Sequence, residues 1–96
     1  MKKTKIYLIS DGTFIKIGIT SNIRKRIKNL QTGNPNYLKV IFTYYVDDAE
    51  QLEMELHKKF ERKRKAGEWF DLNENDVIVA RNISMGWSRK ILDRVG

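Results

Sequence analysis

A tyrosine at position 7 and a lysine at position 16 are the first side chains that the sequence places together for chemistry. Apolar and polar residues alternate over 4–10 and 14–19, which predicts two short strands joined at Asp11-Gly12, a dipeptide typical of tight hairpin turns. If Asp11 and Gly12 occupy the two central turn positions, Tyr7 lies directly opposite Lys16, with Cβ atoms about 5 Å apart. A phenol beside an ammonium group is suited to proton transfer, so we expect this pair on one face of the hairpin.

A carboxylate and an imidazole form a second candidate pair. Glu53 and His57 lie four residues apart in a helix predicted from Asp47, with Glu50 completing a capping box, to about residue 63. The inward stripe of this helix consists of Ala49, Leu52, Leu56 and Phe60. Glu53 and His57 border the stripe, so the sequence allows either a functional pair or an ordinary surface pair.

A basic helix follows the hairpin and begins at Ser21 or Asn22, both of which suit an N-cap. Its apolar stripe, Ile23, Ile27 and Leu30, is expected to pack inward. Its outward face carries Arg24, Lys25 and Lys28. This face is either a nucleic-acid-binding surface or an ordinary solvated one, whereas Arg26 borders the buried stripe and lies nearer the sheet.

The remaining elements complete an α+β fold. A turn-rich loop over 32–36 precedes a third strand over 38–46, which is apolar on both faces and therefore expected to be central. Residues 67–70 predict a brief strand or an anchored loop, and residues 73–96 a C-terminal helical segment with Gly86 as a point of interruption. The order β-β-α-β-α-α predicts one domain over residues 1–96, a small three-stranded antiparallel sheet flanked by helices.

Composition narrows the functional classes. The net charge of +7 on 96 residues favours a polyanionic partner, nucleic acid before an anionic membrane. The chain has no cysteine and one histidine, which excludes disulfides and argues against a zinc centre or a transition-metal enzyme. No apolar run approaches the roughly 18 residues that span a bilayer, and no secretory signal is present. We therefore expect a cytoplasmic protein that does not contact a membrane.

Several spaced motifs together resemble the GIY-YIG endonuclease superfamily. They are Lys5-Ile6-Tyr7, Lys16-Ile17-Gly18, Arg26 and the helical Glu53. The KIG form of the second motif and the closing Gly67-Glu68-Trp69-Phe70 are similar to a small phage-associated branch, and the resemblance covers roughly residues 5–72. Two positions depart from the family pattern, because Lys5 stands where the first motif has glycine and Lys16 where the second has tyrosine.

The resemblance implies a role for each matching residue. Tyr7 would act as a base or position the attacking water, and Lys16 would take or relay the proton with it. Arg26 would hold the scissile phosphate, and Glu53 would bind Mg²⁺ or Mn²⁺. Gly18, which has no side chain, would leave room for the phosphate to approach.

These parts are sufficient for phosphodiester hydrolysis. Mg²⁺ keeps several waters and needs only one or two carboxylates, so Glu53 with a phosphate oxygen of the substrate is an adequate site. His57, one turn after Glu53, would orient a water or contact a phosphate. The resemblance thus implies a magnesium-dependent DNA endonuclease of low sequence specificity and of phage or mobile-element origin, for which a homodimer would allow double-strand cleavage.

Two other functions remain open at this point. One is a catalytically weak or inactive nucleic-acid-binding module that kept the fold but lost a catalytic group when the second motif tyrosine became Lys16. The other is a protein-interaction domain that uses the aromatic side chains of Tyr44, Tyr45 and Trp87.

Overall fold

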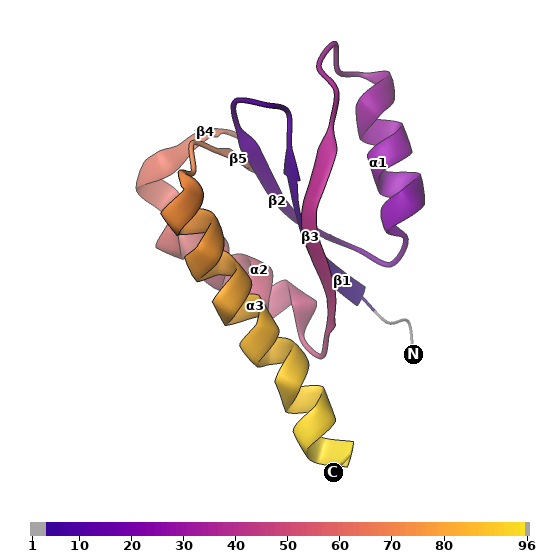
Figure 1. Ribbon diagram of the computed structural model, residues 1–96, viewed down its shortest axis with the longest axis vertical. Helices are drawn as coiled ribbons and strands as arrows, with labels where there is room; N and C mark the ends of the chain where they lie inside the picture. The colour runs from indigo at the N-terminus through magenta and orange to yellow at the C-terminus, as the bar shows by residue number, and fades with distance from the viewer. Residues whose placement is uncertain (1–3, 96) are drawn as a thin grey trace.

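The computed structural model describes residues 4–95, and the side chains of residues 4–88. A sheet is covered on one face by α1 and on the other by α2 and α3, and the C-terminal part of α3 projects past the sheet (Figure 1). Among residues 4–95, no helix is long and apolar enough to cross a bilayer. The elements in chain order are β1 (Thr4–Ser10), β2 (Ile15–Thr20), α1 (Ile23–Thr32), β3 (Lys39–Val46), α2 (Ala49–Lys59), the 3₁₀ helix η1 (Glu61–Lys63), β4 (Arg64–Ala66), β5 (Trp69–Phe70) and α3 (Glu74–Val95).

The sheet is antiparallel throughout, with strand order β3-β1-β2-β5-β4. The predicted α+β class is confirmed, but the sheet has five strands instead of three because residues 64–70 fold back as a hairpin beside β2. The prediction that the third strand is central was wrong, since β3 lies at an edge and β1 is in the middle of the β3-β1-β2 group. β3 is apolar on both faces because α1 and α3 cover its two sides.

The predicted register of the first hairpin was wrong by two residues. Tyr7 pairs with Gly18, and Lys16 pairs with Ile9. Tyr7 and Lys16 are therefore diagonal neighbours and not directly opposite. A shift of two residues keeps every side chain on its predicted face, so both side chains still lie on the same side of the sheet.

The side chain of Asp11 explains the register. Its Oδ1 accepts hydrogen bonds from the backbone N–H groups of Thr13, at 2.8 Å, and Phe14, at 2.7 Å. These bonds close a loop longer than the two-residue turn that the dipeptide Asp11-Gly12 suggested, and Gly12 takes a positive φ of 98° within it.

Two hydrophobic clusters form the core. The larger lies between the sheet and helices α2 and α3, and the predicted inward stripe of α2 is buried in it. The smaller lies under α1, whose predicted stripe packs against Tyr7, Ile9 and Leu38. Tyr7 thus belongs to the α1 side of the sheet, whereas Leu52 and Leu56 of α2 lie on the opposite side.

The helix ends differ from the sequence predictions in detail. Asn22, one of the two predicted candidates, is the N-cap of α1. The N-cap of α2 is Asp48, whereas Asp47 was predicted. α2 also ends at Lys59, after which η1 tightens the chain before β4. α3 continues through Gly86 without interruption. At its start, Asn73 and Asp76 each accept a hydrogen bond from the other's backbone N–H.

Candidate active site at the edge of strand β2

Strand β2 has an open edge where its pairing with β5 ends. Of the residues of β2, β5 pairs only with Ile15 and Lys16. The next residue, Ile17, donates its backbone N–H to the Glu68 carbonyl oxygen at 3.0 Å, and its own carbonyl lies 2.9 Å from Nε2 of His57. Because a carbonyl only accepts hydrogen bonds, Nε2 carries a proton, and in the neutral tautomer with this contact Nδ1 is the nitrogen with the lone pair. One peptide segment therefore positions both His57 and Glu68.

Three potential metal ligands meet at this edge. Glu53, His57 and Glu68 are all partly buried, and one ligand atom from each lies within 4.8 Å of the others. Ligands bound at about 2.1 Å from one ion lie about 3 Å apart when adjacent and about 4.2 Å apart when opposite. A divalent ion therefore fits between these three side chains after shifts of less than an ångström.

Burial raises the pKa of the Glu53 carboxyl, and the nearby carboxylate of Glu68 raises it further. His57 and Lys16 lower it but do not offset these two effects. A cation between the two glutamates would offset their mutual repulsion.

Glu68 was not among the residues singled out from the sequence. It follows Gly67 in the β4–β5 turn, where a φ of 55° at Gly67 reverses the chain. Arg64 stabilises this turn by donating to the Gly67 carbonyl oxygen and to Oε2 of Glu61. The sequence did place a glutamate inside the closing motif at 67–70, and this was the signal that could have identified Glu68. Its position beside Glu53 depends on how the β4–β5 hairpin folds back against β2.

The predicted register placed Lys16 against Tyr7, but in the structure Lys16 contacts Glu68. Its Nζ lies 3.2 Å from Oε1 of Glu68, and its side chain is only 13% exposed. The ammonium group also lies 5.6 Å from the centre of the Trp69 ring. Lys16 therefore joins the metal-ligand cluster to the face of the sheet that carries Tyr7.

Tyr7 and Arg26 form the part of the site beneath α1. Tyr7 is fully buried, and its hydroxyl lies 3.5 Å from Nη1 of Arg26, which is partly buried as expected from its place beside the apolar stripe. A Cβ atom at Gly18 would lie 2.4 Å from the Tyr7 hydroxyl oxygen. The space above Gly18 is thus filled by the phenol ring, and Gly18 is needed to admit Tyr7.

Electrostatics link the two parts into one site. Burial raises the pKa of the Tyr7 phenol, Arg26 lowers it in part, and Glu68 and Glu53 raise it again. The net pKa lies above the ordinary value of 10.0, so Tyr7 is a neutral phenol at neutral pH. The three basic residues of the outward face of α1, Arg24, Lys25 and Lys28, are exposed and lie outside this network.

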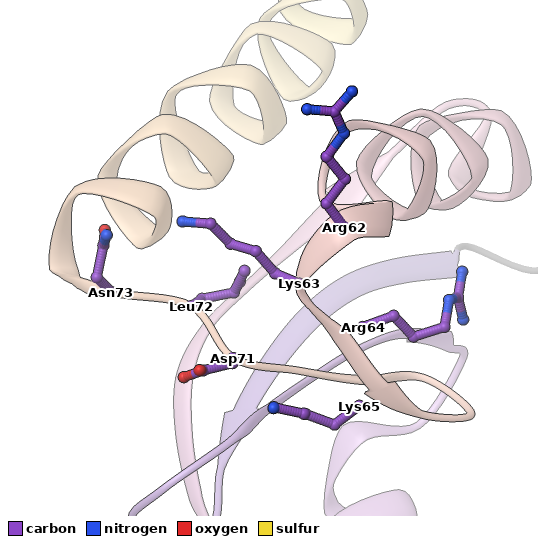
Figure 2. Close-up of a pocket in the computed structure, with 7 residues that line it drawn as sticks. All are labelled: Arg62, Lys63, Arg64, Lys65, Asp71, Leu72 and Asn73. Atoms are coloured by element: carbon purple, nitrogen blue, oxygen red, sulfur yellow. The ribbon is translucent and has the colours of Figure 1, made fainter.

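A basic pocket lies at the other end of β5 from Glu68. It has a volume of about 330 Å³ and is lined by Arg62, Lys63, Arg64, Lys65, Asp71, Leu72 and Asn73 (Figure 2). Figure 2 shows Lys63 and Lys65 pointing to the side on which Asp71 and Asn73 lie, whereas Arg64 points away. Lys63 is bound to Asp76 of α3, so Lys65 is the lysine of this pocket without a carboxylate partner among the described side chains.

Comparison with known proteins matches most of the chain to a protein-family model. No curated protein and no solved structure matches the chain. Residues 4–85 match the model of the T5orf172 domain family. This range includes every residue of the site, from Tyr7 to Glu68, and covers most of the sequence. The chain therefore belongs to the T5orf172 domain family.

Proposed function

We propose that this protein is a metal-dependent nuclease that hydrolyses phosphodiester bonds in DNA, with an active site of the GIY-YIG type. The observation that supports this most is the convergence of six side chains at the edge of β2, supplied by both faces of the sheet and by one turn. They offer a phenol, a guanidinium, an ammonium, two carboxylates and an imidazole: Tyr7, Arg26, Lys16, Glu53, Glu68 and His57.

In this proposal Arg26 binds the scissile phosphate. The guanidinium is partly exposed and rests against the buried Tyr7 hydroxyl, so movement of Arg26 toward a phosphate would also uncover the phenol. The Tyr7 oxygen accepts a hydrogen bond from Arg26, which leaves the phenol proton free to be donated. Because its pKa is raised, Tyr7 would orient the attacking water or donate a hydrogen bond, and would not act as a phenolate base in the free protein.

The carboxylate of Glu53 would hold the divalent ion, Mg²⁺ or Mn²⁺. Such an ion, when bound, would stabilise negative charge on the departing 3′ oxygen. Lys16, kept in place by Glu68, would contact a phosphate oxygen or relay a proton. His57 is fixed by Ile17 on one ring nitrogen and would use the other toward the site.

Basic surfaces on two sides would hold the DNA backbone. One is the outward face of α1, and the other is the pocket that contains Lys65 (Figure 2). Low sequence specificity stays part of the proposal. Dimer formation and a cytoplasmic location stay predictions.

The decisive test is plasmid nicking with Mg²⁺, with Mn²⁺ and with chelator. Glu53→Gln should abolish metal-dependent cleavage while DNA binding stays within a factor of a few, and Glu55→Gln, an exposed change of the same charge on the same helix, should cleave normally. Tyr7→Phe should lower the rate by about a hundredfold or more, because it removes the donor that orients the water. Wild-type cleavage by Glu53→Gln would refute the metal assignment.

A second candidate function is a nucleic-acid-binding module without catalysis. Two observations favour it: Tyr7 is fully buried, and the lysine that replaces the motif tyrosine is already paired with Glu68. The same assay separates the two functions. Salt-dependent DNA binding without nicking in either metal would support the binding module.

A further inference from the structure

We propose that Glu53, His57 and Glu68 form a three-ligand site that selects a divalent transition-metal ion over Mg²⁺ and binds it before DNA is present. This inference rests on the proposed function, since it concerns the metal of the same site. It differs from two sequence-based expectations: a single carboxylate that completes its site with a substrate phosphate, and a protein that is not a transition-metal enzyme.

The positions of the three side chains support the site. Glu53 and His57 lie one turn apart on the same face of α2, and Glu68 approaches from the β4–β5 turn. Their ligand atoms lie within 4.8 Å, close to the separation of ligands around one ion. Three protein ligands bind an ion without help from a substrate, whereas one carboxylate does not hold it firmly.

The hydrogen bond of His57 is a second and independent observation. Histidines that bind metals almost always donate their other ring N–H to a carbonyl or a carboxylate, which fixes the tautomer and the ring orientation. Here Nε2 is 2.9 Å from the Ile17 carbonyl oxygen, and the ring packs against Phe70 with centroids 5.1 Å apart. Nδ1 is thus left as the basic nitrogen of a ring that is already held in place.

The chemistry of the donors determines which ion is preferred. Mg²⁺ favours oxygen ligands and keeps most of its waters, whereas imidazole nitrogen suits transition-metal ions. Two carboxylates and one imidazole give a mixed set with two negative charges, which suits an ion of the Mn²⁺, Fe²⁺ or Co²⁺ type. Lys16, at 3.2 Å from Glu68, opposes the ion electrostatically but leaves the second carboxylate oxygen of Glu68 available.

The test measures metal binding by the full chain without DNA, with Mn²⁺ as the probe because its free form gives a strong EPR signal. We expect one Mn²⁺ per chain, with Mg²⁺ displacing it only at more than about tenfold excess. Glu68→Gln should weaken Mn²⁺ binding by about tenfold or more, while Glu55→Gln should match the wild type. Equal Mn²⁺ affinity in wild type and Glu68→Gln, or equal affinity for Mg²⁺ and Mn²⁺, would overturn the inference.

Pulsed EPR of the Mn²⁺ complex supplies a readout specific to the imidazole. The wild type should show coupling to a nitrogen nucleus, and His57→Gln should lose it; a wild-type complex without this coupling contradicts the site. If Glu68→Gln fails to fold, Lys16→Gln is tested instead. Removing the ammonium group that opposes the ion should raise the Mn²⁺ affinity severalfold. An unchanged or lower Mn²⁺ affinity counts against the site.

The outcomes distinguish this inference from the proposed function. A protein that nicks DNA with Mg²⁺ and needs Glu53 but binds no Mn²⁺ alone would retain the nuclease and lose the three-ligand site. A protein that binds Mn²⁺ through all three residues and cleaves nothing would retain the site and lose the nuclease.

Discussion

Replacing Glu53 by glutamine is expected to make the metal-free protein more stable. Burial and the Glu68 carboxylate raise the pKa of Glu53 in the folded protein above its ordinary value of 4.5. A raised pKa of an acid means that stability is greatest below the ordinary pKa and is lost as pH rises through the folded pKa. At neutral pH the ionised Glu53 therefore destabilises the fold, and glutamine removes that charge with little change of shape.

The magnitude follows from the separation of the two carboxylates. The ligand atoms of the two carboxylates lie within 4.8 Å of each other, and at that upper limit two like charges repel by about 0.9 kcal/mol at a dielectric constant of about 80 and by about 3.5 kcal/mol at about 20. Both groups are partly exposed, and Glu53 also loses its attraction to Lys16, so the low end applies. A gain of about 1 kcal/mol raises the melting temperature of a domain of this size by about 4–8 °C.

Circular dichroism melts of chelator-treated protein measure this difference. At about pH 7.5 the melting temperature of Glu53→Gln should exceed that of the wild type, and at about pH 3.5 the two should converge because Glu53 is then protonated. Saturating Mn²⁺ should stabilise only the wild type and reverse the order. Glu55→Gln should change little at either pH. A Glu53→Gln variant that is no more stable at pH 7.5 would refute the repulsion argument.

Three further predictions concern packing, pH dependence and the basic helix. Gly18→Ala should destabilise the protein by about 1–3 kcal/mol in urea unfolding, because the added Cβ would meet the Tyr7 hydroxyl at 2.4 Å. Tyr7→Phe removes that hydroxyl, so the double variant should recover part of the loss. If the effects of the two substitutions on stability simply add, the contact is contradicted. Burial alone would raise the pKa of Asp76, but the hydrogen bonds from Lys63 and from the Asn73 backbone N–H, together with the charge of Lys63, outweigh burial and lower the pKa. Asp76→Asn should therefore lower the free energy of unfolding by about 1 kcal/mol at neutral pH. This difference from the wild type should shrink as the pH falls below the ordinary pKa of 3.8. A difference that persists at low pH would count against the ion pair. Replacing the α1 residues Arg24, Lys25 and Lys28 together by alanine should flatten the salt dependence of DNA binding, by about 0.9 in log–log slope for each phosphate that the helix no longer neutralises; an unchanged slope would remove α1 from the DNA-binding surface.

The sequence predicted those parts of the fold that depend on periodicity. The apolar stripe of α2 is buried, and that of α1 is partly buried against the sheet, as expected. Tyr7 and Lys16 share a face because a shift of two residues in register keeps every side chain on its predicted face. The register itself depended on the Asp11 side chain, whose hydrogen bonds to the loop do not follow from residue propensity.

The elements that were missed are short. β4 and β5 have three and two residues, too few to show a period, so the sheet was expected to stop at three strands. Glu68 was missed for the same reason, since its contact with Lys16 and its place beside Glu53 and His57 exist only after this hairpin docks on β2. The spacing of Glu53 and His57 could be read from one helix, but their third partner could not.

The candidate site draws on both faces of the sheet and on chain positions from 7 to 68, which has a consequence for newly made protein. Tyr7 leaves the ribosome first, yet its partners in α1, in α2 and in the β4–β5 turn arrive in succession, and Glu68 arrives last. No shorter N-terminal fragment that ends before Glu68 contains the complete set, and a chain whose β4–β5 hairpin has opened lacks Glu68 at the site. In such chains Lys16 has no Glu68 carboxylate to hold it in place, so the proposed site would be complete only in fully folded molecules.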